Sequence, residues 1–154
     1  MEFKHKVRTC LFFATEAEEA ANFYVSLLPD SGIDNLVKPD PSGPALVVEF
    51  IVGGMPMMAM NGNSNVESSH TQSISVLTED QAETDRLWTL LTAGGGAEGR
   101  CGWLQDRYGI HWQIVPKALP KLMSTGDAAQ GARVQAALMT MSRIDIAGLE
   151  AAAA

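Results

Sequence analysis

The sequence has 154 residues, of which 46% are hydrophobic and 19% are charged, a composition typical of a folded globular protein and not of a disordered chain. Its formal net charge is −7 and its basic residues are scattered singly, which argues against a nucleic-acid partner. No apolar run is long enough to span a membrane, and Cys10 and Cys101 form no CxxC pair. We therefore expect a cytoplasmic protein with no membrane partner.

A repeat with a spacing of about 63 residues organises the chain, as from Thr15 to Thr78. Residues 7–13 form an apolar run of strand type, and a helix with apolar residues at helical spacing follows Thr15. Residues 73–77, Thr78 and a second helical segment repeat this order. We expect each threonine to cap the helix after it. The repeat predicts two related modules in one chain.

Each predicted helix is followed by short strands. In the first half Gly53-Gly54 predicts a two-residue hairpin that pairs Val52 with Met55 and Glu49 with Met58. Gly94-Gly95-Gly96 follows the second helix and is typical of a helix stop. The strand-like runs are residues 36–37, 45–52 and 56–61 in the first half, and 102–105 and 110–115 in the second.

The end of the chain is predicted to be helical. Residues 118–123 form a short turn, and Val134, Leu138 and Met141 form an apolar stripe on a longer helix. We predict an α+β fold made of two βαβββ modules in a single domain. The domain is expected to span residues 1–149, and a low-complexity tail follows at 150–154. Within the domain we expect a first module at 6–62, a second module at 71–116 and C-terminal helices at 117–149.

Two βαβββ modules in about 140 residues resemble the vicinal oxygen chelate superfamily, which includes glyoxalase I and bleomycin-resistance proteins. Residues 17–24, the run 101–116, Met60-Asn61-Gly62 and Arg143-Ile144-Asp145-Ile146 are similar to its PhnB-like branch, which carries the inherited name 3-demethylubiquinone-9 3-methyltransferase. The resemblance implies a half-barrel cavity, a small-molecule ligand and a homodimer. The methyltransferase activity does not follow from the residues, because the chain has no GxGxxG turn between a strand and a helix.

The superfamily's enzymes hold a divalent metal with one side chain from each of four strands. The resemblance implies that these positions fall on Thr9, on Met58 or Met60, on Gln72 or Ser73, and on Gln113. None of these residues offers an imidazole or a carboxylate, and a methionine thioether is a soft ligand. We therefore expect no metal and no other cofactor.

Three other residues are candidates for the cavity wall, and a fourth, Trp112, is assigned to the core. His111 alternates with Gln113 along its strand, so it is either a hydrogen-bonded wall residue or an acid/base group. Glu49 lies among apolar residues, and either lines a polar cavity, where a desolvated carboxylate could act as a base, or is exposed on an uncovered sheet face. Trp103 is expected in the pocket, whereas Trp112 is expected in the core under a helix.

His70, by contrast, is expected to be solvated in a loop rich in Ser and Asn. Our first hypothesis is a metal-free protein that binds an unknown small molecule. The second is an enzyme of this fold, either the inherited methyltransferase or a glyoxalase-like lyase or dioxygenase, with Glu49 or His111 as the catalytic acid/base. The third is a resistance-type dimer that sequesters a drug. The predicted ligand-binding residues are Thr9, Met58, Asn61, Ser73, Trp103 and Gln113.

Overall fold

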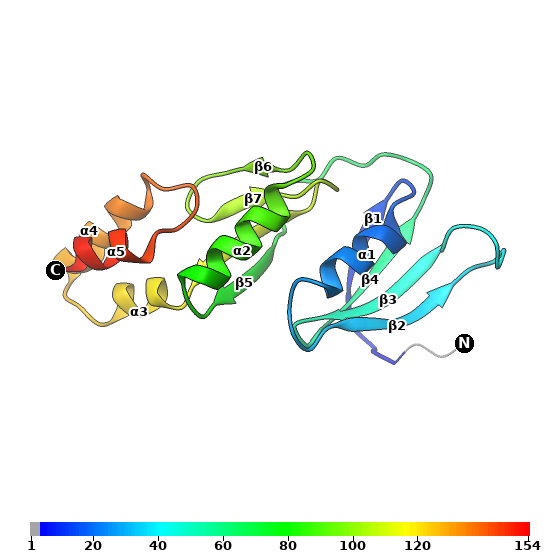
Figure 1. The fold of residues 1–154 in the computed structure, drawn as a ribbon, viewed down its shortest axis with the longest axis horizontal. Helices are drawn as coiled ribbons and strands as arrows, with labels where there is room; N and C mark the ends of the chain where they lie inside the picture. Colours follow the sequence, from blue (N-terminus) through cyan, green and yellow to red (C-terminus); the bar gives the residue numbers. More distant parts are fainter. Residues whose placement is uncertain (1–3) are drawn as a thin grey trace. The chain divides into compact units, whose positions relative to one another are not determined.

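The computed structural model describes residues 4–154, which fall into two compact units with the boundary between Glu67 and Ser68. Figure 1 shows that each unit contains its own sheet and its own long helix. The boundary lies between the two predicted modules. None of the helices in residues 4–154 is long and apolar enough to cross a membrane.

The first unit is a βαβββ module. Its elements are β1 (Thr9–Phe13), α1 (Ala17–Val25), β2 (Gly32–Val37), β3 (Val47–Val52) and β4 (Met55–Asn61). The strand order is β1-β4-β3-β2, and β1 runs parallel to β4 while the other pairs are antiparallel. Gly53 and Gly54 both have positive φ and form the β3–β4 turn. The predicted hairpin is confirmed, since Val52 pairs with Met55 and Glu49 with Met58.

The second unit begins with the same order of elements. They are β5 (Ile74–Thr78), α2 (Gln81–Thr92), β6 (Ala97–Glu98), β7 (Trp103–Gln105) and β8 (His111–Pro116). The strand order β5-β8-β7-β6, with β5 parallel to β8, repeats that of the first sheet. The α+β fold with duplicated βαβββ modules is therefore confirmed. Gly94 and Gly95 have positive φ directly after α2, in agreement with the predicted helix stop.

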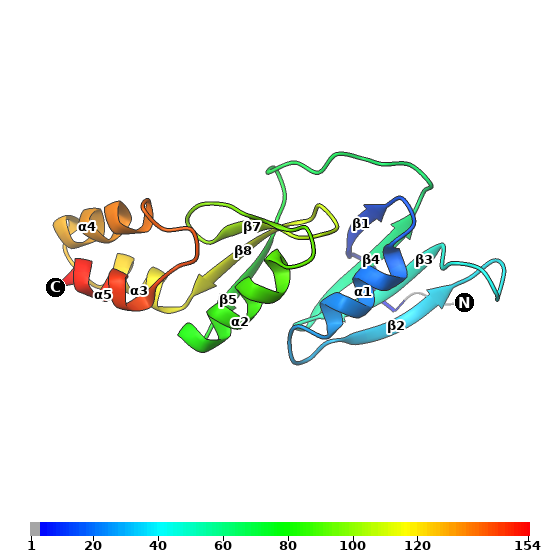
Figure 2. The same ribbon diagram turned by 45° about the horizontal axis from the view of Figure 1, so that its top comes forward.

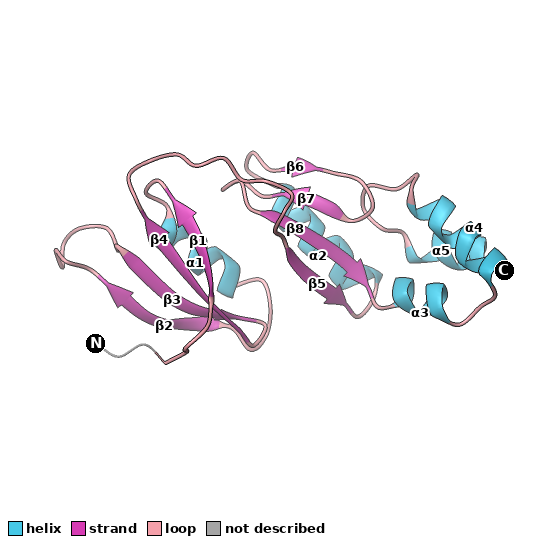
Figure 3. Cartoon of the chain, turned by 180° about the vertical axis from the view of Figure 1, so that it is seen from behind, coloured by secondary structure: helices cyan, strands magenta, loops and turns pink. Residues whose placement is uncertain are grey.

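One face of each sheet is covered by the helix of its own unit. Strand alternation turns Leu11, Phe13 and Met57 toward the α1 side, where all three are buried. Trp112 and Ile114 are fully buried on the α2 side. Figure 3 views the sheets from the opposite side, with the strands in front of α1 and α2. We call this uncovered side of each sheet its open face.

The helix caps differ from the prediction. Asp80, not Thr78, caps α2, because its side chain accepts a hydrogen bond from the Glu83 backbone N–H at 2.9 Å. The Thr78 hydroxyl is instead buried against that of Thr84 at 2.6 Å. The N-cap of α1 is Glu16, which makes no side-chain cap bond. Thr15 and Thr78 were therefore wrong as caps, because each helix starts later than the threonine.

The C-terminal segment is helical, as predicted. It contains α3 (Ala118–Ser124), α4 (Ala128–Leu138) and α5 (Ile146–Ala153). The three helices pack together beyond the end of β8, as Figure 2 shows. Val134, Leu138, Ile144 and Leu149 form their common core. Helix α5 continues through residues 150–153, which the sequence analysis set apart as a tail.

Candidate functional site

The open face of the first sheet carries a row of four residues that the register aligns across the strands. Cys10 pairs with Met58, Met58 with Glu49, and Glu49 with Asn35. Glu49 is only 5% exposed, so it is not the exposed carboxylate that the second of its two predicted settings describes. Met58 is half-buried beside it. A carboxylate in such a position needs a partner.

Arg8 is that partner, and the sequence analysis did not single it out. Its Nε lies 3.1 Å from Glu49 Oε1, with the side chains 17% and 6% exposed. Its Nη1 also donates to the His5 carbonyl at 2.7 Å. Arg8 lies two residues before Cys10 and so continues the open face beyond the start of β1. Strand alternation could have identified Arg8 from the sequence, since it puts positions 8, 10 and 12 on one side of the strand.

Thr9 and Asn61 do not lie with these open-face residues. Thr9 shares its side of β1 with Leu11 and Phe13, which is the side that α1 covers, although Thr9 itself is exposed at the strand end. Asn61 is buried, and its Oδ1 accepts from the Ala17 backbone N–H at 2.9 Å while its Nδ2 donates to the Ala45 carbonyl at 2.8 Å. Asn61 thus ties the end of β4 to the start of α1, which is a structural task.

The open face of the second sheet brings together four of the predicted residues. Gln113 pairs across the strands with Trp103, and its Nε2 donates to the Ser73 hydroxyl at 2.8 Å. This bond places Ser73, rather than Gln72, beside Gln113. His111 lies two residues before Gln113, on the same side of β8, and is 6% exposed. Trp103, Gln113 and Ser73 are half-buried and accessible.

His70 joins this group from the loop that precedes β5. Its ring centroid lies 4.2 Å from that of His111 and 6.2 Å from that of Trp103. The prediction of an exposed His70 is correct, but the residue is not merely solvated, since it lies against two site residues. Sequence periodicity could not find this contact, because His70 belongs to no strand or helix.

Burial and the neighbouring His70 lower the pKa of His111 below its ordinary value of 6.5, and the Asp106 carboxylate opposes them. Asp106 is itself fully engaged. Its Oδ1 accepts from the backbone N–H groups of Tyr108 and Ile110, and its Oδ2 accepts from the Trp112 indole at 2.8 Å. These bonds hold the β7–β8 turn and place Trp112 in the core, as predicted. The neutral imidazole is therefore the favoured form of His111 near neutral pH.

The superfamily's divalent metal does not fit the residues present. No group of three or more His, Cys, Asp or Glu side chains within residues 4–154 could hold a metal ion. The amide of Gln113 already donates to Ser73, and Met58 offers only a thioether. The buried carboxylate nearest to Met58, that of Glu49, faces the cationic Arg8. A divalent cation would therefore meet only the neutral donors Gln113 and Met58, or, beside Glu49, the positive charge of Arg8.

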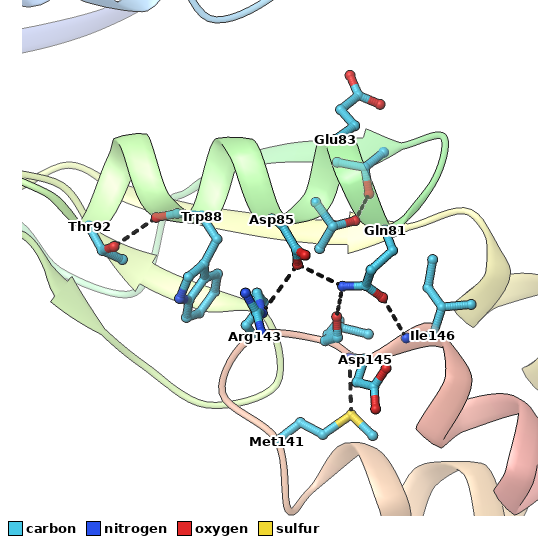
Figure 4. A network of polar contacts seen from close by, with 12 residues as sticks. Gln81, Glu83, Asp85, Trp88, Thr92, Met141, Arg143, Asp145 and Ile146 are labelled. Atoms are coloured by element: carbon cyan, nitrogen blue, oxygen red, sulfur yellow. Dashed lines mark hydrogen bonds and ion pairs between the residues drawn. The ribbon is translucent and has the colours of Figure 1, made fainter.

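A separate polar network joins α2 to the C-terminal helices, as shown in Figure 4. The Gln81 amide donates to the Ile144 carbonyl at 3.0 Å and accepts from the Ile146 backbone N–H at 2.8 Å. Asp85 bonds both Gln81 and Arg143. A depression of about 560 Å³ lies beside this network, lined by Trp88, Thr89, Thr92, Glu98, Ser142 and Arg143.

The Trp88 indole donates to Glu98 at 2.7 Å, so the acid of this depression is already engaged. Its base, Arg143, is likewise engaged by Asp85 at 3.2 Å. The depression lies along α2, on the opposite side of the sheet from His111. We therefore place the candidate site on the open face and not here.

The strand order, the paired modules and the open-face residues point to one family, and its model agrees. The family model described as 3-demethylubiquinone-9 3-methyltransferase matches residues 5–115. The chain belongs to this family. The expected resemblance to the PhnB-like branch of the vicinal oxygen chelate superfamily is thereby confirmed. The match contains both βαβββ modules and every predicted site residue, and it ends within β8.

Solved structures of similar proteins support the family assignment. A PhnB protein from Bacillus cereus, described as a 3-demethylubiquinone-9 3-methyltransferase, is 29% identical with a TM-score of 0.64, over 73% of this chain and 99% of that one. Protein PA1353 from Pseudomonas aeruginosa is 21% identical with a TM-score of 0.60, over 73% and 98%. The fosfomycin resistance protein FosX from Mesorhizobium loti is 13% identical with a TM-score of 0.51, over 74% and 92%.

The last two likenesses concern the fold alone. A comparison with curated proteins finds no match. The family description therefore fixes the architecture of this chain, and the chemistry must be argued from its own residues.

Proposed function

We propose that this protein binds a small organic molecule on the open face of its second sheet, without the superfamily's metal. The observation that carries the proposal is the gathering of Ser73, Trp103, His111 and Gln113 on a sheet face that no helix of its unit covers. Trp103 offers an apolar ring, and the other three offer hydrogen-bonding groups. A few polar groups around an apolar wall are typical of ligand sites.

A ligand screen tests this proposal. Thermal shift measured against a diverse library should reveal compounds that stabilise the wild type, because binding to the folded state raises its stability. Trp103→Ala and His111→Ala should remove the shift. Gln135→Ala, an exposed change on α4, is the matched control and should leave it unchanged. Hits that keep their full shift in both site variants would place the ligand elsewhere and contradict the proposal.

The absence of a metal requirement is tested separately. Protein purified without added metal should contain no stoichiometric divalent ion, and a chelator should not change its Tm. A stoichiometric ion lost in Gln113→Ala would contradict this part of the proposal and restore the superfamily's chemistry.

A second candidate function is catalysis with His111 as general base. The observation that favours it is the lowered pKa of this buried histidine, since a neutral imidazole can accept a proton near neutral pH. Glu49 is the other candidate base, but Arg8 faces its carboxylate. Unlike the binding proposal, which expects His111→Ala to lose the ligand, catalysis by His111 expects this variant to bind the hit compound and no longer convert it, while Glu49→Gln converts it at the normal rate.

The third hypothesis is a homodimer that sequesters a drug. What supports it is the shared fold with FosX, and that is likeness of fold alone. Light scattering at micromolar concentration should give twice the chain mass of 16.5 kDa. A monomer with full ligand affinity would contradict the dimer while leaving the binding proposal intact.

A further inference from the structure

The rings of His70, His111 and Trp103 converge from three separate parts of the second unit. His70 comes from the loop before β5, Trp103 starts β7, and His111 starts β8. The two imidazoles are 4.2 Å apart between ring centroids and tilted by 43°, and the Trp103 ring meets His70 edge-on. The three rings form one wall on the open face.

His111 is the buried member of this wall. It is 94% buried, and within residues 4–154 no protein group makes a hydrogen bond to either of its ring nitrogens. These nitrogens are not among the fully enclosed, unbonded polar atoms of residues 4–154, so they reach the surface of the open face and are available to a ligand. Both the other rings are more accessible, so a molecule resting on them would reach His111 from their side.

The charged groups around His70 and His111 favour an anionic ligand over a cationic one. The groups that act on the charge of His111 are His70 and Asp106. Both oxygens of Asp106 are occupied by Tyr108, Ile110 and Trp112, so this carboxylate is not free to receive a cationic ligand. Each imidazole can donate an N–H, and a charged acceptor makes such bonds shorter and stronger.

We propose that His70 and His111 together bind the carboxylate of a planar aromatic acid, whose ring rests against Trp103. This inference rests on the proposed binding function and names the class of its ligand. It gives a role to His70, an exposed loop residue, and to the ring nitrogens of His111. It also predicts a preference by charge that a merely apolar site would not have.

Three probes with one ring and different charge test this inference on the full chain: benzoate, benzyl alcohol and benzylamine. The sequence has three histidines, so the imidazole Hε1 protons give three NMR signals and His5 is an internal control. Benzoate should shift the His70 and His111 signals and leave that of His5 in place. Benzyl alcohol should bind about tenfold more weakly, since a charged acceptor adds on the order of 1.4 kcal/mol, and benzylamine should not bind at millimolar concentration.

His70→Phe is the decisive variant, because it keeps a ring on an exposed loop and removes the N–H donor. It should lose the preference for benzoate over benzyl alcohol, and should still bind benzyl alcohol. His111→Gln should also lose the preference, and His5→Ala should retain it.

Equal binding of benzoate and benzyl alcohol to the wild type would overturn the acid-binding inference while leaving the proposed small-molecule function in place. Benzoate binding that survives both His70→Phe and His111→Gln would overturn the assignment of these residues. Failure of benzoate to bind at all would overturn the inference, and the library screen would still judge the proposed function independently.

Discussion

Arg8 Nε lies 3.1 Å from Glu49 Oε1 on a sheet face that carries no helix, and both side chains are largely removed from water. Breaking a buried ion pair leaves an uncompensated charge, which typically costs about 3 kcal/mol or more. Glu49→Leu and Arg8→Met should each destabilise the first unit by about that amount. The double variant should recover most of the loss, because an apolar pair of similar volume avoids the desolvation of both charges.

All three tryptophans lie in the second unit, so tryptophan fluorescence does not follow this change. Hydrogen–deuterium exchange of the β3 amides should be used, with faster exchange expected in each single variant. A double variant as unstable as either single one would show that the loss arises from packing and not from the unpaired charge.

The lowered pKa of His111 makes stability depend on pH. The unfolded chain binds a proton at a pKa near 6.5, and folded His111 resists it, so protonation favours the unfolded state. The contribution is fully present above pH 6.5 and is lost as the pH falls toward the folded pKa. Wild type should therefore lose more stability than His111→Gln between pH 7.5 and 5.5, as measured by urea unfolding followed by tryptophan fluorescence.

The control for this comparison is His5→Gln, which should follow the wild type throughout. Parallel curves for wild type and His111→Gln would contradict the assigned environment of His111.

Gly102 should tolerate no side chain. Its φ is +84°, and a Cβ there would lie 2.7 Å from the Ile114 carbonyl oxygen and 2.9 Å from Ile144 Cδ1. Gly109, in the same unit, has a φ of +83° and only an ordinary contact at 3.6 Å, so it is a matched control. Gly109→Ala should cost about 1–2 kcal/mol from backbone strain, and Gly102→Ala about 1–3 kcal/mol more from the clash. Urea unfolding followed by fluorescence measures both, and equal losses would refute the steric argument.

Gln81 should hold the C-terminal helices on α2 through its two bonds to the backbone of residues 144 and 146. Gln81→Ala leaves these peptide groups without their partner and should cost about 1–2 kcal/mol. Amide exchange is expected to become faster in α5 and to stay unchanged in β8. Gln135→Ala, exposed on α4, should change neither. Unchanged exchange in α5 would mean that other contacts carry the attachment.

Local patterns in the sequence predicted much of the fold. Gly53-Gly54 between two apolar runs fixed the register that pairs Glu49 with Met58, because the side-chain period of a strand is two residues. The same period explains why Thr9 does not lie on the open face with the other predicted residues. Alternation along β1 puts Arg8 and Cys10 on that face. The position of Thr9 was found by counting back from the helix motif, and such a count does not show which face of the strand a residue occupies.

The candidate site could be predicted only where strand alternation defined it. His111, Gln113 and Ser73 follow from a single strand register, and the structure brings them together. The contact of His70 with His111 depends on how a loop folds back over a sheet, which no periodicity encodes. Asn61 was assigned from a motif, and the motif does not say that its amide is used up by Ala17 and Ala45.

The three C-terminal helices lie outside the matched family segment, and they pack mainly against one another around their own apolar core. A cluster that buries its own surface and is joined to its neighbours by a few bonds can open without unfolding the rest. Residues 117–154 should thus unfold as a separate cooperative unit, distinct from the duplicated modules. Its opening would expose the shared apolar core of the three helices, leave α2 on the second sheet, and leave the imidazole pair on the open face undisturbed.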